Sequence, residues 1–129
     1  MSTSYNTTDE QLTELRRNLQ IRALNDAFRT EPLSLGSTLA RNSLVVTRGV
    51  ADYGNDFIDR AVAAVQTFAN FNEHNDPHGE HNFGAFEIDG VALFWKIDCY
   101  DRWSQWGSPD AADPAVTRRV LTILLADEY

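Results

Sequence analysis

The densest group of side chains that could do chemistry lies in the polar stretch of residues 70–82. Its histidines, His74, His78 and His81, follow the spacing H-x3-H-x2-H and alternate with carboxylates. Imidazole and carboxylate ligands suit zinc, manganese or iron, and a three-ligand site with an open position activates water. The spacing matches no known metal signature, however, and Asn and Asp side chains that close their own turns explain the same composition. We predict a loop here, with His74, His78 and His81 as candidate metal ligands.

A second ionisable group lies at the end of a predicted strand. Alternation along an extended chain places Lys96, Asp98 and Tyr100 on one face, as a metal-dependent nuclease or hydrolase would require. Nuclease sites of the restriction-enzyme type carry an acid two residues before the lysine, where this chain has Phe94. A salt-bridged end of the sheet is the alternative interpretation. Cys99 points to the opposite face, where a lone cysteine behaves as a small buried hydrophobe; a nucleophile paired with His81 is the alternative.

Aromatic side chains gather next to this group. Trp103 and Trp106 lie in an irregular stretch beside Arg102, and aromatic residues with Arg are enriched at binding hot spots. Phe94 lies on the strand face opposite the predicted core, so it is exposed unless another segment covers it. These residues form a candidate contact surface, although the tryptophans could equally cover the core.

Charge is concentrated in the middle of the chain. The formal net charge is −8, and residues 49–113 carry twelve acids against three bases, a net −9. Such a field repels phosphate backbones and favours cationic partners, so direct nucleic-acid binding is not expected. Ordinary solubility explains the same acidity. The anionic candidates for a contact surface are Asp76, Glu80, Glu87, Asp89, Asp98, Asp101 and Asp110.

Composition and motifs exclude several classes of protein. The single cysteine excludes an internal disulfide, no apolar run is long enough to cross a bilayer, and no leader segment opens the chain. No glycine-rich phosphate loop, nucleophile elbow or dinucleotide fingerprint is present, so we expect no cofactor. We therefore expect one domain over residues 1–129, with a flexible N-terminus at 1–8, in the cytoplasm.

Periodicity predicts the elements that would position these groups. Leucines at helical spacing after a capping box predict a helix over 9–28, and the β-branched run 44–47 predicts a strand. A second amphipathic helix begins near Asp56. Asp89-Gly90 joins two strands over 83–88 and 91–98 in a hairpin, because a type I′ turn requires positive φ at both central residues.

A closing helix is expected after the Asp113-Pro114 cap, over 114–127. The order is then α-β-α-β-β-α. We predict an α+β fold in which a three-stranded antiparallel sheet packs with helices in two layers, its core joining the hairpin to the apolar stripes of all three helices.

The chain resembles an uncharacterised proteobacterial family of small proteins, a domain of unknown function often found on plasmids and other mobile elements. The resemblance extends over residues 21–129, and its most specific stretches are 21–29, 75–86, 94–98, 107–108 and 112–123. It implies no catalytic residue, only a bacterial, mobile-element setting.

Together these features favour a small acidic protein-binding module over an enzyme. We expect a basic partner protein, with an inhibitor of host nucleic-acid-directed defence, of the anti-CRISPR or anti-restriction type with a DNA-mimic-like surface, as the most specific form of this hypothesis. The alternatives are a metal-dependent hydrolase or nuclease that uses the loop from His74 to His81, and a structural protein with no catalytic role.

Overall fold

The computed structural model describes residues 8–30, 38–39 and 42–129. The longest helix, α1 (Asp9–Thr30), is followed by the short α2 (Arg48–Ala51) and by α3 (Asn55–Gln66), so both predicted N-terminal helices are confirmed. Of the predicted flexible segment 1–8, only Thr8 is described, and it caps α1. The predicted connection between α1 and the first strand lies largely outside the described residues.

The sheet is larger than predicted, and it is mixed. The strands β1 (Thr38–Leu39), β2 (Asn42–Val46), β3 (Phe83–Ile88), β4 (Val91–Tyr100) and β5 (Arg118–Leu125) form one sheet in the order β1-β2-β5-β4-β3. β2 and β5 are parallel, whereas the other neighbours are antiparallel. The α+β class is confirmed, but the three-stranded antiparallel sheet is wrong because it lacked β5, which lies at the centre.

The predicted closing helix over 114–127 is the source of that error. Asp113 does cap a helical turn, since its Oδ1 accepts a hydrogen bond from the Ala115 amide at 2.9 Å, but only the 3-10 turns η1 (Pro114–Val116) and η2 (Ala126–Glu128) form. Between them β5 is extended, and Arg119, Leu121 and Ile123 are buried on one side. Its β-branched residues fit a pleated strand between two neighbours better than a helix.

The hairpin of β3 and β4 has the predicted register. Ile88 pairs with Val91, and Gly84 pairs with Trp95. Asp89 and Gly90 have φ values of 52° and 79°, as the predicted turn requires.

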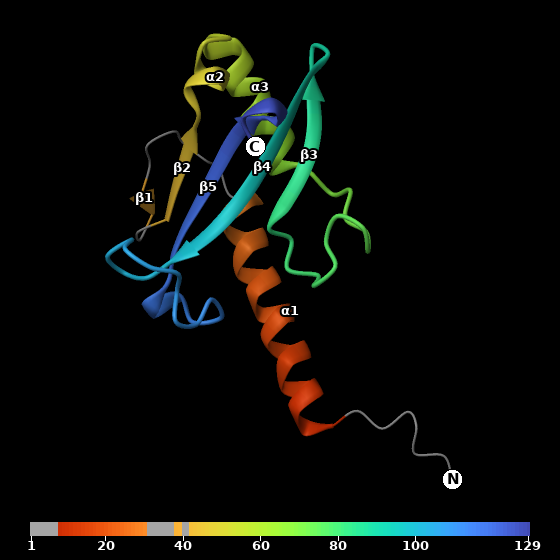
Figure 1. The fold of residues 1–129 in the computed structure, drawn as a ribbon, viewed down its shortest axis with the longest axis vertical. Helices are drawn as coiled ribbons and strands as arrows, with labels where there is room; N and C mark the ends of the chain where they lie inside the picture. The colour runs from red at the N-terminus through yellow and green to blue at the C-terminus, as the bar shows by residue number, and fades with distance from the viewer. Residues whose placement is uncertain (1–7, 31–37, 40–41) are drawn as a thin grey trace.

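The core lies between the sheet and the helices. In Figure 1, α3 and the C-terminal end of α1 lie behind the sheet, and α2 lies above the end of β2. Side chains from α2, α3, β2, β4 and β5 form one buried apolar cluster, whose members are Leu44, Val50, Phe57, Ala61, Val65, Leu93, Trp95, Ile97, Leu121 and Ile123. Contrary to prediction, the apolar stripe of α1 does not join this core as a whole: Leu12, Leu15 and Leu19 are exposed, and α1 buries Ile21, Asn25 and Arg29 instead.

Candidate protein-binding surface

The sheet has a second face, which no α-helix of the described residues covers. Strand registers place Val45, Thr122, Lys96 and Phe83 in one row across β2, β5, β4 and β3. We call this side the open face. Its side chains are mostly half-buried, and Val45 is 40% exposed. The open face is the surface turned toward the viewer in Figure 1.

Aromatic rings cover one end of the open face. The Phe83 and Phe94 rings lie 5.1 Å apart between centroids, and the Tyr129 ring lies 5.3 Å from Phe94 and 5.9 Å from Phe83. Tyr129 therefore covers part of Phe94, while its own side chain stays 74% exposed. Sequence reasoning singled out Phe94 but missed Tyr129, because nothing local to the last residues indicates a contact with β4.

A loop held by its own hydrogen bonds adjoins the other end of the open face. We call residues 101–106 the tryptophan loop. The Asp101 Oδ1 accepts hydrogen bonds from the amides of Trp103 at 3.1 Å and Gln105 at 3.0 Å, and the Asp101 amide donates to the Trp106 carbonyl at 2.9 Å. Ser104 adopts a positive φ of 58° within this turn. Asp101 thus fixes the loop as an Asx turn. Its Oδ1 is occupied by hydrogen bonds within the turn and is therefore less available to a partner.

The tryptophan loop presents both indole rings to solvent. Trp103 is 71% exposed and Trp106 is 75% exposed, so the alternative in which they cover the core is excluded. The Arg102 guanidinium lies 5.2 Å from the centre of the Trp103 ring, in a cation–π contact. Arg118 donates from Nη1 to the Ser104 hydroxyl at 3.0 Å, and this bond ties the loop to β5 and the open face.

Lys96 and Asp98 share the open face, as predicted from strand alternation. The Lys96 Nζ lies 2.8 Å from the Asp98 Oδ2, and this carboxylate raises the pKa of the Lys96 ammonium. Both groups are therefore held in an ion pair, as in the alternative interpretation of a salt-bridged end of the sheet.

The predicted anionic residues are not gathered into one ridge. Asp89 lies at the tip of the hairpin, where its carboxylate binds Arg60 at 2.7 and 3.0 Å and the guanidinium lowers the pKa of Asp89. Asp98 lies roughly 25 Å further along the hairpin, at about 3.4 Å per residue. Asp110 follows the tryptophan loop in the chain and pairs with Arg17 on α1 at 3.4 Å. Glu87 is exposed on the open face of β3.

The polar stretch 70–82 is a loop, as predicted, and two of its carboxylates accept hydrogen bonds from other residues of the loop. The Asp76 side chain is only 6% exposed, and its Oδ1 accepts hydrogen bonds from the amides of Glu80 and His81. Glu80 in turn accepts a bond from Asn82 at 3.4 Å. The Asp76 carboxylate therefore supports the backbone of this loop and is largely removed from the surface, whereas Glu80 binds a neighbouring side chain.

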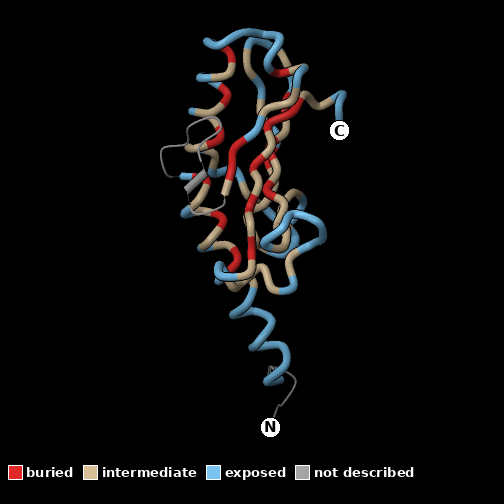
Figure 2. The backbone as a smooth tube through the Cα atoms, turned by 90° about the vertical axis from the view of Figure 1, so that its left-hand side faces the viewer, coloured by how far each residue is buried: buried red, intermediate tan, exposed pale blue. Residues whose placement is uncertain are grey.

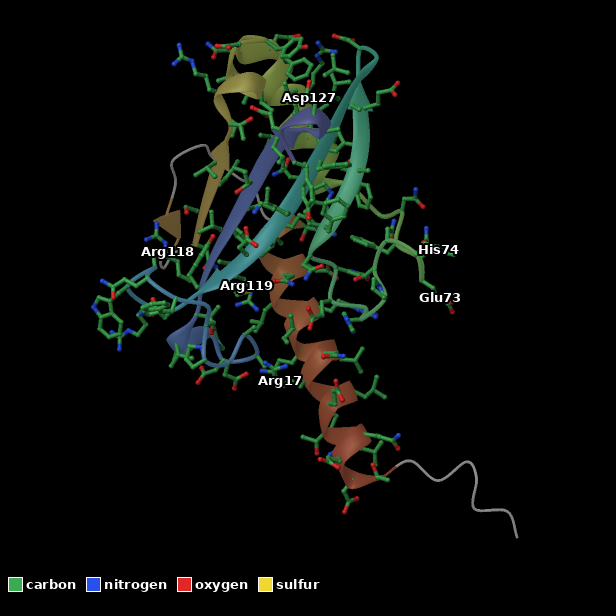
Figure 3. The ribbon with its side chains drawn as sticks, viewed as in Figure 1. Arg17, Glu73, His74, Arg118, Arg119 and Asp127 are labelled. Carbon is green, nitrogen blue, oxygen red and sulfur yellow. The ribbon has the colours of Figure 1, made fainter. Side chains whose placement is uncertain are left out.

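His81 is enclosed, whereas the other two histidines are exposed. The His81 Nδ1 lies 2.9 Å from an Asp26 oxygen, its Nε2 lies 3.6 Å from Asp76, and its ring stacks on Phe71 at 3.7 Å. Figure 3 shows His74 at the outer rim of the loop, away from the body. Within the part of the chain that the structure describes, no three His, Cys, Asp or Glu side chains are grouped so as to hold a metal ion.

Cys99 packs against the core at the end of β4, as its strand position predicts. Burial raises the pKa of its thiol, which disfavours the thiolate. Both ring nitrogens of His81 face carboxylates, so that histidine is not placed to act as a base for Cys99.

The fold and this surface define a small α+β protein with a mixed sheet, one uncovered sheet face and an aromatic loop beside it. The chain belongs to the family described as protein of unknown function (DUF3768), whose model matches residues 46–128, or 83 of its 129 residues. The match spans α2, α3 and β3 to β5 and leaves out α1.

No curated protein and no solved structure matches the chain. No helix among the described residues is long and apolar enough to cross a membrane.

Proposed function

We propose that this chain is a non-enzymatic protein-binding module whose contact surface is the tryptophan loop together with the adjoining open face. The observation that carries this function is the exposure of Trp103 and Trp106, at 71% and 75%, on a loop whose backbone is already fixed. Burying each ring against a partner would contribute on the order of 3 to 4 kcal/mol before the cost of association. Because the loop is ordered in advance, little of that gain would be lost in ordering it.

We propose that the partner is a basic protein. The net charge of −8 would accelerate association with a cationic surface, while the tryptophans would slow dissociation. In its most specific form, the partner is a nucleic-acid-binding defence effector that this chain inhibits in the bacterial cytoplasm, on behalf of a mobile element. The spread of the acids favours general steering over close imitation of a phosphate backbone.

The test is affinity capture from the native host with the full chain, read by mass spectrometry, followed by a binding assay with the purified partner. Trp103→Ala/Trp106→Ala should reduce the affinity at least a hundredfold without lowering the melting temperature. Tyr53→Ala is the matched control, since Tyr53 is also an exposed aromatic residue at 52% but lies in the turn between α2 and α3.

The salt dependence of the association rate tests the partner class. A basic partner predicts that association slows steeply as ionic strength rises, whereas dissociation changes little. Partner affinity that survives loss of both tryptophans would refute the proposed surface. Association that is independent of salt would refute the cationic partner.

A further inference from the structure

The first half of α1 projects beyond the rest of the molecule. Figures 1 and 2 show α1 leaving the body below the sheet, with its N-terminal turns exposed on all sides. Every residue of 9–17 is exposed, and the first buried residue is Ile21. The contacts of this half with the body lie near its base, where Arg17 pairs with Asp110 and the Gln20 side chain donates to the Ala112 carbonyl at 3.1 Å.

This projecting half carries an apolar stripe on the side away from the body. Leu12, Leu15 and Leu19 lie at i, i+3 and i+7, which places them on one face, and they are 36%, 54% and 47% exposed. Ile21 follows Leu19 by about 200° of rotation, so the stripe is opposite the side that packs against the body. Contacts within the described residues 8–30, 38–39 and 42–129 therefore do not explain three leucines in this arrangement.

The projecting half is stabilised locally as a helix. The Thr8 amide donates to Gln11 Oε1 at 2.9 Å, and the Gln11 amide donates to Thr8 Oγ1 at 3.1 Å, forming a capping box. Asp9 and Glu10 in the first turn favour the positive end of the helix dipole. A helical segment without tertiary contacts is only marginally stable in water. The capping box and the acidic first turn favour the helix, and they therefore help to keep the three leucines on one preformed face.

We propose that this stripe pairs with the same stripe of a second copy of the chain, with the two helices antiparallel. With Leu12 and Leu19 at heptad position a and Leu15 at d, Leu12 of one copy packs beside Leu15 of the other. The pairing region is then about residues 8–19. Because the helices run in opposite directions, the two bodies lie at opposite ends of the pair and do not collide.

The charges beside the leucine stripe favour a second copy of the chain as its partner, and they favour the antiparallel orientation of the two helices. Asp9 and Arg16 are exposed, lie seven residues apart and flank the stripe on the same side. In the antiparallel pair Asp9 of each copy faces Arg16 of the other, which forms two equivalent ion pairs. In a parallel pair Arg16 would instead face the neutral Gln11, so neither ion pair would form.

The experiment is sedimentation equilibrium of the full chain up to about millimolar concentration. The wild type should shift from the 14.5 kDa monomer to twice that mass. Leu15→Glu should weaken the association at least tenfold while circular dichroism shows the helix unchanged. A wild type that remains monomeric throughout, or a dimer that persists in Leu15→Glu, would overturn the pairing.

Charge variants test the direction. Asp9→Arg alone and Arg16→Asp alone should each weaken self-association, and an equimolar mixture of the two should restore it. Glu10→Arg is the matched control, since it changes the same first turn on the side away from the stripe and should leave association unchanged. A mixture that fails to restore association would exclude the antiparallel arrangement. Trp103→Ala/Trp106→Ala should dimerise normally, which separates this surface from the proposed partner surface.

Discussion

The backbone of Gly84 in β3 lies directly against the indole of Trp95 in β4, its partner in the hairpin register. A Cβ at position 84 would overlap the indole nitrogen of Trp95 and the ring of Phe68, both of which are held by surrounding aromatic contacts. Trp95 is fully buried, so it cannot move outward to make room. The missing side chain at 84 is therefore a packing requirement of the core.

Gly84→Ala should accordingly lower the free energy of unfolding by about 1 to 3 kcal/mol through overpacking. Urea denaturation followed by tryptophan fluorescence measures the change. Gly107→Ala is the control, because a Cβ there meets no atom within 4 Å and φ is not in the left-handed region. Equal losses in the two variants would mean that general glycine effects, and not the Trp95 contact, determine the result.

A second prediction concerns the buried polar link between α1 and β5. Asn25 accepts a hydrogen bond from the Arg119 Nε at 2.7 Å and donates to the Glu80 carbonyl at 2.9 Å. Figure 3 shows Arg119 between the sheet and α1. Burial lowers the pKa of Arg119, since desolvation penalises the charged guanidinium.

Asn25→Ala would leave the Arg119 Nε without this acceptor and should cost about 1 to 3 kcal/mol. Thermal and urea unfolding measure the loss. Gln20→Ala, which removes a hydrogen bond from the exposed side of α1 to Ala112, should cost less than about 1 kcal/mol. A small effect of Asn25→Ala would show that water replaces the Asn25 side-chain oxygen as the acceptor of the Arg119 hydrogen bond.

The sequence predicts elements whose signals are local and leaves out contacts made by distant segments. Asp89-Gly90 specifies the hairpin, and with it the Gly84–Trp95 pairing, because the turn alone sets the register. The residues of β5 fit either a helical stripe or strand alternation, and the parallel pairing with β2 that decides between them joins residues far apart in the sequence. The same limit applies to the candidate site. The ring of His81 is held by Asp26, 55 residues away, so neighbouring residues do not reveal that it is enclosed.

The acid sensitivity of the protein should depend in part on Glu128. Its Oε1 accepts hydrogen bonds from the Thr47 hydroxyl at 2.6 Å and the Leu125 amide at 2.8 Å, and these bonds lower the pKa of the carboxyl from its ordinary value near 4.5. A carboxyl whose pKa is lowered by folding stabilises the protein above the unfolded pKa. That contribution is lost as the pH falls through the folded pKa.

Glu128→Gln should therefore lower the melting temperature at neutral pH, and the difference from the wild type should shrink as the pH falls to about 3. Melting curves of both proteins across this range test the prediction. A difference that stays constant with pH would mean that shape or packing at position 128, and not the carboxylate, stabilises this end of the sheet.

The last prediction links the order of the tryptophan loop to binding. Asp101→Ala removes the acceptor of the Trp103 and Gln105 amides, so the loop should lose about 1 kcal/mol of local stability, and these two amides should exchange faster with solvent. Asp101→Asn keeps a side-chain carbonyl and should retain most of the turn. If the preformed loop is what binds, Asp101→Ala should weaken partner binding although both indoles remain, because the partner must then order the loop. Hydrogen exchange by mass spectrometry and partner affinity, measured on the same three proteins, should rank them wild type, Asn, Ala. Equal loss of binding in both variants would assign the role of Asp101 to its charge and not to the turn.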